Sequence, residues 1–406
     1  MLDWLVVGGG PHGVHVALRL LEDGGVPRDS IRIVDDEERL LARWRRSTRN
    51  TGMQFLRSPS VHHIDVSSTS LSHFASRGGR RVGKPFTRPY ARPALELFDL
   101  HCDDVIERNE LHSLHVRGRA RHLDLSEPSV RVGFEDPTGA GQDGELRARN
   151  VILAIGAPQE PAWPDWARRA LDSDTEARGR IRHLFDPGFE LEDAPGDTAI
   201  AVVGAGISGA QLALRLVQKG RRVILVSRHA LRIHQFDSDP GWLGPKNMAA
   251  FARIQDPNER RAQIRAARHR GSMPRDVHLA LRGAQNEGTL ELIEGSEVSA
   301  ARITEQGVAL ELEGKEVPVD RVVLATGFPF RRPGGGWLDE AIEAFDLPCA
   351  DCGYPILDRE LRWHRQLFVT GPLAELELGP VSRNLSGAQR AGERLAAVAI
   401  EARSAA

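Results

Sequence analysis

Cysteine is scarce in this chain, with three residues among 406, and tyrosine is scarcer still, with two. Three cysteines cannot form a disulfide framework, which favours a reducing compartment and predicts a cytoplasmic protein. No apolar run reaches the roughly 18 residues that a membrane span needs. The chain also does not open on a basic segment followed by an apolar one, as a secretory signal would. We therefore expect a soluble protein with no membrane partner.

The chain also lacks an excess of either charge, because 54 Lys and Arg residues face 56 Asp and Glu, for a net charge of −2. Without a basic field, no nucleic-acid partner is expected. The histidines show no H-E-x-x-H or comparable spacing, so no metal site is predicted. Hydrophobic residues make up 41% of the sequence, and 406 residues suffice for two or three domains with cores of their own.

What the chain does contain is a repeated strand, glycine turn and helix. An apolar run over residues 4–7 leads into Gly8-Gly9-Gly10-Pro11-His12-Gly13, and a helical pattern follows. The next strand, over residues 31–34, ends in Asp35-Asp36. A turn of this kind lets the backbone pass close to a pyrophosphate. Asp35, or else Asp36, is placed to accept from a ribose hydroxyl, which predicts FAD or NAD here.

The same pattern begins again 196 residues later. A strand over residues 199–203 leads into Gly204-Ala205-Gly206-Ile207-Ser208-Gly209 and a helix, and the next strand ends in Ser227-Arg228 instead of an acid. A guanidinium at that place can bind a 2′-phosphate, which predicts NADPH. A solvated surface arginine is the alternative. Because each copy follows a strand and opens a helix, the pair predicts two dinucleotide sites.

The segments between the repeats predict the domain organisation. Residues 111–150 and 290–318 alternate short apolar runs with turn residues, as β-meanders do, and each leads into a buried strand that ends in glycine. We predict an α/β fold with two Rossmann-like dinucleotide-binding domains plus small β-meanders. The FAD domain is expected over 1–165 and 320–406. An NAD(P)H domain over 166–319 is inserted into it, with a helical elaboration at 234–285.

This order of parts resembles the two-dinucleotide flavoproteins, and within them the flavin-dependent N-hydroxylating monooxygenases, which act on lysine, ornithine or diamines. Residues 320–328 are similar to that family's D-x-x-x-L-A-T-G-Y segment. Gly52-Met53-Gln54, after Trp44, looks like the segment that lays a Met-Gln pair beside the flavin ring. Residues 371–387 resemble the closing flavin-binding segment. The residues with which the family grips an amino acid have no match here.

The glycine turns and this resemblance together predict a set of cofactor-binding residues on both halves of the chain. They are Gly8, Gly10, Pro11, His12, Gly13, Asp35, Asp36, Trp44, Gln54, Gly156, Gly204, Gly206, Ser208, Gly209, Ser227, Arg228, Gly327, Gly371, Asn384 and Leu385.

The resemblance implies an FAD-dependent, NADPH-using monooxygenase that activates O₂ as a flavin hydroperoxide and oxygenates a soft nucleophile, an amine nitrogen of an amino acid or diamine. Such chemistry needs a dry flavin face more than an acid–base residue, so no catalytic residue is predicted. The alternative is an NAD(P)H-dependent reductase of a disulfide, quinone or protein partner. A non-catalytic nucleotide sensor is a further alternative. The expected partners are a small-molecule substrate and O₂, and a homo-oligomer is left open.

Four segments have two interpretations each. Cys349-Ala350-Asp351-Cys352 is either a redox pair or two loop thiols. The arginine run over residues 43–49 either approaches cofactor phosphates or is a solvated surface. The proline-stiffened loop over residues 85–93 either clamps an anion or connects two elements. His183 either faces the nicotinamide or does not.

Overall fold

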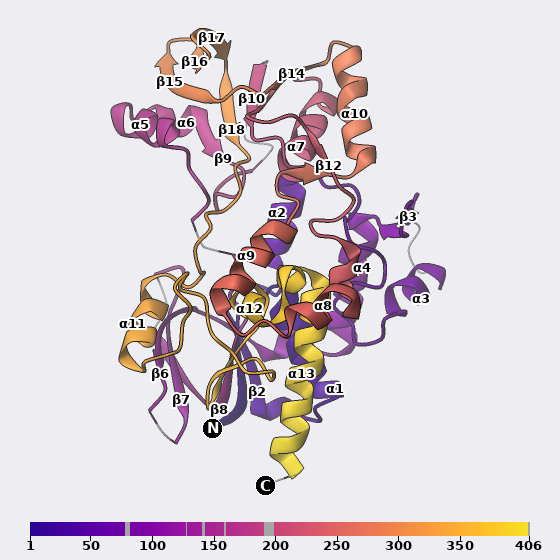
Figure 1. Ribbon diagram of the computed structural model, residues 1–406, viewed down its shortest axis with the longest axis vertical. Coiled ribbons are helices and arrows are strands. Elements are labelled where there is room, and N and C mark those ends of the chain that lie inside the picture. The colour runs from indigo at the N-terminus through magenta and orange to yellow at the C-terminus, as the bar shows by residue number, and fades with distance from the viewer. Residues whose placement is uncertain (78–81, 127, 140–142, 158–159, 191–198, 405–406) are drawn as a thin grey trace.

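The computed structural model describes residues 1–77, 82–126, 128–139, 143–157, 160–190 and 199–404. Its elements divide between two halves, and both chain ends lie in the lower half in Figure 1. Each half is built around a sheet with a parallel core. No helix in the described part of the chain is both long and apolar enough to cross a membrane.

The lower sheet has the order β19-β20-β8-β1-β2-β5. Its strands are β1 (Leu2–Val7), β2 (Ile31–Asp35), β5 (His115–Arg117), β8 (Gly144–Leu153), β19 (Arg362–His364) and β20 (Leu367–Val369). All neighbours pair in parallel except β19 and β20. The central strand β1 is apolar without alternation because helices and chain cover both faces of the sheet. The predicted meander is present as β6 (Arg119–Asp124) and β7 (Val130–Glu135), which continue from β8.

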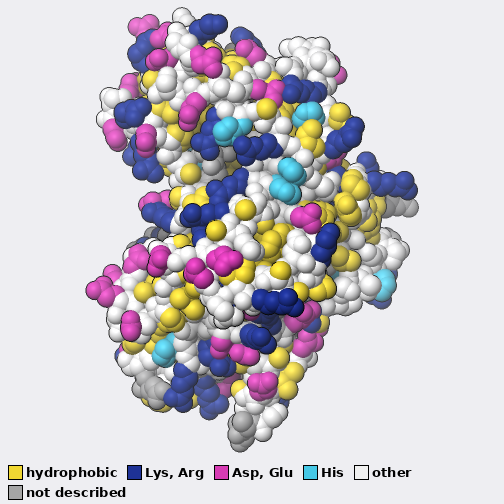
Figure 2. Space-filling model, in the orientation of Figure 1, with side chains coloured by type: hydrophobic (Ala, Val, Ile, Leu, Met, Phe, Trp, Pro, Cys, Tyr) yellow, Lys and Arg dark blue, Asp and Glu magenta, His cyan; other side chains and the backbone are white. Residues whose placement is uncertain are grey.

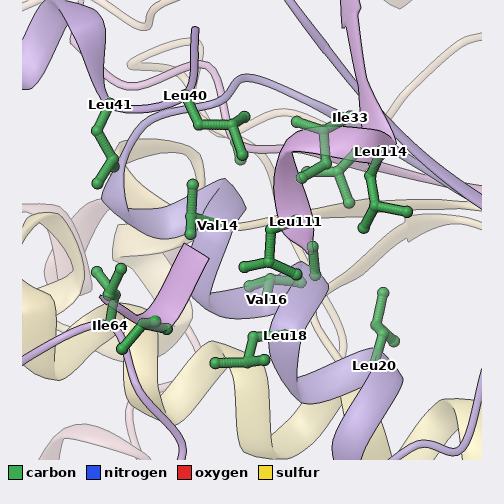
Figure 3. Packing of buried hydrophobic residues seen from close by; sticks show 14 of the residues in the cluster. Val14, Val16, Leu18, Leu20, Ile33, Leu40, Leu41, Ile64, Leu111 and Leu114 are labelled. Carbon is green, nitrogen blue, oxygen red and sulfur yellow. The ribbon is translucent and has the colours of Figure 1, made fainter. Parts of the chain in front are cut away.

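Helix α1 (Pro11–Glu22) lies between this sheet and the last helix, α13 (Leu385–Ser404). Because it is covered on two sides, α1 is buried around most of its circumference. In Figure 3 its Val14, Val16 and Leu18 point into a core that also receives Ile33 of β2. Around this core lie η1 (Arg28–Ser30), α2 (Ala42–Thr51), α3 (Ser70–Ser76), the β3–β4 pair (Phe86–Thr87, Arg92–Pro93), α4 (Leu95–Arg108) and η2 (Leu111–Leu114). Helix α11 (Gly336–Ala344) belongs to a second apolar cluster, with β8 and β20.

The upper sheet has five parallel strands in the order β14-β11-β10-β18-β9. They are β9 (Ile181–His183), β10 (Ala199–Val203), β11 (Arg222–Ser227), β14 (Leu290–Glu294) and β18 (Arg321–Leu324). Helices α7 (Ile207–Gln218) and α10 (Arg275–Asn286) share one apolar cluster with the sheet. A second cluster joins it to α5 (Asp165–Ser173) and to the antiparallel strands β15 (Val298–Thr304), β16 (Gly307–Leu312) and β17 (Lys315–Val319); the short α6 (Ala177–Arg180) precedes β9. The predicted fold class is confirmed.

The predicted domain boundary at residue 320 is wrong. Strand β18 begins at Arg321 and pairs with β10 and β9, so it belongs to the upper sheet. Its run Val322-Val323-Leu324 is buried like any central parallel strand, and the residues alone do not say which sheet receives it. The chain returns to the lower half only after this strand.

The helical elaboration also differs from its predicted role, since most of it packs on the lower half. Helix α9 (Pro257–Ala267) contacts α12 (Glu375–Leu378) and η5 (Pro380–Arg383). The turn η3 (Pro240–Leu243) packs against α8 (Pro245–Phe251) and also contacts η5. Trp242, Phe251 and Ile264 share a small core with Tyr354 and Leu376. The short strands β12 (Arg232–Ile233) and β13 (Ser272–Met273) frame this insertion, and η4 (Gly371–Ala374) precedes α12.

Candidate functional site

The first glycine turn connects β1 to α1 and leaves open space in front of the helix. Gly10 is the N-cap of α1 and offers no side chain to its first N–H groups. A Cβ atom on Gly10 would meet nothing within 4 Å, whereas one on Gly13 would lie 1.8 Å from the carbonyl oxygen of Gly8. Gly13 is therefore needed for strand–helix packing, and Gly10 keeps the helix N-terminus accessible to an anion.

The carboxylate at the end of β2 braces this turn. The backbone N–H of Gly9 donates to Asp35 Oδ2 at 2.5 Å, and that of Glu37 donates to Oδ1 at 3.0 Å. Burial raises the pKa of Asp35, opposed by these two backbone hydrogen bonds. Asp36 lies beside it and pairs with Arg43 at 3.2 Å and Arg119 at 3.3 Å. Asp35 therefore stabilises the backbone of the turn, and Asp36 forms ion pairs at the rim of the turn.

A cavity of about 300 Å³ opens in front of the first turn. Seven of the predicted residues line it: Gly8, Gly10, Pro11, Asp35, Asp36, Trp44 and Gly156. Sequence reasoning missed others on its wall, among them Ser47, Asn50, Arg119 and Trp337. Of the arginine run, Arg43 and Arg46 line the cavity and also bind Glu37, whereas Arg45 pairs with Asp103.

The second glycine turn repeats the geometry of the first at the start of α7. Gly206 is the N-cap, and the nearest atom to a Cβ placed there would be Gly271 Cα at 3.5 Å. A Cβ on Gly209 would lie 1.8 Å from the carbonyl oxygen of Gly204. Gly209 therefore permits close strand–helix packing, as Gly13 does in the first turn. Gly206 keeps the helix N-terminus open, as Gly10 does.

Ser227 is the last residue of β11 and Arg228 follows it, at the edge where β2 places its acids. Ser227 is buried and its hydroxyl donates to the carbonyl oxygen of His229 at 2.6 Å. Arg228 is exposed and has no hydrogen bond or ion pair to another residue in the described ranges. The guanidinium is therefore free to bind an anion, while the serine hydroxyl already has a protein acceptor.

A larger cavity of about 1380 Å³ runs from the second turn along the junction of the two halves. Seven predicted residues line it: Gly204, Gly206, Ser208, Ser227, Arg228, Gly327 and Asn384. Phe185 and Phe328 line both cavities, and their rings are stacked with centroids 5.1 Å apart. The two cavities therefore adjoin at this aromatic pair.

Other predicted residues lie behind the cavities. His12 Nδ1 is 3.0 Å from Thr370 Oγ1, and burial lowers the pKa of His12 to about 4. Gly371 passes close to the His12 ring, and Leu385, the first residue of α13, is buried in the core. These residues fasten the closing segment of the chain to the first glycine turn.

Gln54 is not brought to either cavity, contrary to prediction. Its carbonyl oxygen accepts from the N–H of Leu95 at 2.9 Å, which fixes the backbone, and its side chain is exposed. It lines a separate hollow with Arg49 of α2 and Arg215 of α7. The residues of this segment that line the larger cavity are Arg57, Ser58, Pro59 and His62.

Two side chains with an open role, His183 and Arg92, have structural partners. His183 is buried, with Nε2 3.1 Å from Thr326 Oγ1 and Nδ1 accepting from the N–H of Phe185, so it does not face the cleft. Arg92 is buried and pairs with Asp276 of α10 at 2.7 Å, which makes its loop a connector. Cys349 and Cys352 are free thiols, and neither lines either cavity.

The family profile described as pyridine nucleotide-disulphide oxidoreductase matches residues 2–242 and 198–371. The tRNA 5-methylaminomethyl-2-thiouridine biosynthesis bifunctional protein MnmC of Paraburkholderia phytofirmans is 29% identical over 202 residues. That match covers 48% of this chain and only 30% of the relative.

Two solved structures are similar over nearly the whole chain. Ornithine hydroxylase PvdA from Pseudomonas aeruginosa has a TM-score of 0.76 at 18% identity, covering 98% of this chain and 99% of that one. The FAD-bound cadaverine monooxygenase DfoA from Erwinia amylovora has a TM-score of 0.74 at 16% identity, covering 99% and 95%. At these identities the likeness shows a shared fold.

Proposed function

The chain belongs to the pyridine nucleotide-disulphide oxidoreductase family, and from this premise we propose that it is an FAD-dependent, NADPH-using monooxygenase acting on an amine nitrogen of a small molecule. The observation that carries the proposal is the pair of adjoining cavities, each opening on a glycine turn. One turn is braced by an acid and the other is followed by a free arginine. The shared fold with an ornithine hydroxylase and a cadaverine monooxygenase supports the proposal.

The first cavity suits FAD. Gly10 leaves room for a pyrophosphate against the N-terminus of α1, and Asp36 is the acid on the rim available to a ribose hydroxyl. Arg43 and Arg119 hold Asp36 in place. Phe185 and Phe328 cover the passage to the other cavity with apolar surface, which excludes water there.

The second cavity suits NADPH. The space at Gly206 admits a pyrophosphate to the N-terminus of α7, and Arg228 offers an unpaired guanidinium to a 2′-phosphate. Bound FAD would accept hydride from NADPH and activate O₂. The chain's part is then to bind, orient and exclude water, so we name no acid–base residue. Free thiols at all three cysteines support a cytoplasmic location.

The test is to purify the protein, record its absorbance, and add NADPH under air with and without candidate amines. We expect a flavin spectrum, slow NADPH oxidation alone, and faster oxidation with formation of a hydroxylamine when the right amine is present. Amine-independent turnover that requires a disulfide or quinone would favour the reductase alternative, which the family name also suggests. No turnover above free-flavin leakage would favour a nucleotide sensor.

A further inference from the structure

Arginines line two concave parts of this molecule, and the protein neutralises only one of the two sets. Figure 2 shows Lys and Arg side chains gathered at the waist between the two halves. On the wall of the larger cavity, Arg383 pairs with the buried Glu375 at 2.7 Å, and Arg57 donates to two backbone carbonyl oxygens. The separate hollow between α2 and α7, of about 380 Å³, is lined by four arginines and, among the described residues, one acid. This α2–α7 hollow therefore carries an excess of positive charge.

Helix α2 separates the α2–α7 hollow from the cavity proposed for FAD. The residues of α2 that line the FAD cavity recur at helical spacing: Arg43, Arg46, Ser47 and Asn50. The residues that line the hollow follow the same spacing two positions later: Arg45, Thr48, Arg49 and Gly52. Two positions turn an α-helix by about 200°, so the two sets lie on opposite faces. A ligand in the hollow would therefore be separated from the FAD cavity by the helix itself.

Helix α7 of the upper half also contributes to the hollow. Gly52 ends α2, and a Cβ atom placed on it would lie 2.6 Å from Arg215 Cβ. The missing side chain at Gly52 lets α7 pack against α2 and brings Arg215 to the hollow. A ligand that contacts Arg49 and Arg215 at once would therefore join the two halves of the molecule.

Three of the four guanidinium groups have no partner within the described part of the chain. Arg39, Arg49 and Arg215 are exposed, and their side chains form no hydrogen bond or ion pair with another described residue. The fourth, Arg45, pairs with Asp103 at 2.6 Å. Like charges around a concave surface reinforce each other's potential, so the hollow attracts anions.

The charge and the donors of the hollow favour a compound with more than one phosphate group. One carboxylate, that of Asp99, stands against the three unpaired guanidinium groups, which leaves two positive charges for a ligand to neutralise. A guanidinium donates two parallel hydrogen bonds to a phosphate group. Because the arginines come from separate segments of the chain, a ligand with oxygens on two phosphorus atoms suits them better than a single carboxylate does.

We propose that the α2–α7 hollow is an effector site for a small diphosphate, which binds Arg49 and Arg215 together, with Arg39 as a further donor. The site is distinct from both dinucleotide cavities and goes beyond the proposed reaction. Helix α2 lines the FAD cavity, and α7 begins at the second glycine turn. The bound diphosphate would therefore stabilise the arrangement in which the two cofactor sites adjoin. Inorganic pyrophosphate and the diphosphate group of a nucleotide share this chemistry.

The experiment titrates pyrophosphate by calorimetry into the FAD-loaded protein with NADP⁺ in excess, so that the glycine turns are already occupied. We expect pyrophosphate to bind the wild type and to raise the midpoint of thermal unfolding. Arg49→Ala and Arg215→Ala should each weaken this binding about tenfold or more. Arg215→Lys keeps the charge without the paired donors, so it should weaken binding less than Arg215→Ala. In a parallel titration, tighter binding of ADP would identify a nucleotide as the effector, and weaker binding would identify the inorganic anion.

Arg265→Ala is the matched control, because it removes an exposed arginine of α9 that lines neither the hollow nor either cavity. It should leave pyrophosphate binding unchanged. The proposal is overturned if the wild type does not bind pyrophosphate, or if NADP⁺ displaces it. Binding that persists in both Arg49→Ala and Arg215→Ala would also overturn it. A thermal shift that sodium chloride reproduces at equal ionic strength would show charge screening instead of a site.

Discussion

Substitution of Gly10 and of Gly13, two glycines of the first turn, should damage the protein in different ways. Gly10→Val places its side chain in open space, so we expect a folded protein that has lost FAD. Gly13→Ala drives a methyl group against the carbonyl oxygen of Gly8, which should cost more than about 2 kcal/mol of stability. Thermal unfolding and flavin content, measured on both variants, separate the two effects. A folded Gly10→Val protein that keeps its flavin would show that the cofactor lies elsewhere.

Arg228 should decide which nicotinamide cofactor is used. Its guanidinium is exposed and unpaired within the described residues, and a 2′-phosphate would receive charge-assisted hydrogen bonds worth about 1.5–3 kcal/mol. Arg228→Ala should therefore raise the KM for NADPH about tenfold to a hundredfold and leave the KM for NADH almost unchanged. Arg222→Ala, at the other end of β11, is the control. Equal damage with both cofactors would make Arg228 a surface residue.

The cysteine pair should be dispensable for electron transfer from NADPH. Burial raises the pKa of Cys349, which disfavours the reactive thiolate, and neither cysteine lines either of the two cavities described above. We expect Cys349→Ser and Cys352→Ser to leave steady-state NADPH oxidation within about twofold of the wild type. A large drop in either variant with flavin content preserved would support the disulfide-reductase alternative.

At the scale of elements, one carboxylate holds the insertion to the lower half. Glu375 of α12 is buried and pairs with Arg261 of α9 and Arg383 of η5. Glu375→Gln would leave two guanidiniums without a counter-charge, and breaking a buried pair costs about 3–5 kcal/mol. Urea unfolding followed by circular dichroism should show that loss. In the control, Glu316→Gln removes an exposed pair with Arg302, and the cost should be about 1 kcal/mol or less. Equal losses of unfolding free energy in the two variants would show that the buried pair is no more important than the exposed one.

The glycine turns could be predicted from sequence because strand, turn and helix are local and each glycine's task is set within six residues. The sequence did not allow us to predict which sheet contains β18, because a buried apolar strand fits the centre of either parallel sheet. Gln54 was misplaced because the hydrogen bond that fixes its backbone comes from Leu95. The contact of Asp237 with Asn384 could not be predicted either, because the two residues lie 147 positions apart along the chain and no local pattern encodes it.

For the molecule as a whole, buried histidines predict the response to acid. His15, His101 and His183 are fully buried, and burial lowers their pKa values to about 4, 3 and 4. The unfolded chain, with histidine pKa values near 6.5, therefore binds more protons below that pH. Their stabilising contribution is complete above pH 6.5 and is lost as the pH falls toward 4.

We expect the free energy of unfolding to fall by about 1 kcal/mol per buried histidine between pH 6.5 and 5.5. Urea titrations at a series of pH values measure this slope. His183→Gln removes one titrating group and should make the slope shallower by its share. A stability that stays constant over this interval would contradict the burial of these rings.

The strand order of the lower sheet has a consequence for synthesis on the ribosome. β8 receives its parallel neighbour β20, and α1 its cover α13, from the last tenth of the chain. The upper half, by contrast, has all five of its strands once Leu324 has been made. During synthesis, the strands of the upper sheet should therefore all be available before the first glycine turn can contact Thr370 and Gly371. Capture of the flavin would then be among the last events of biogenesis.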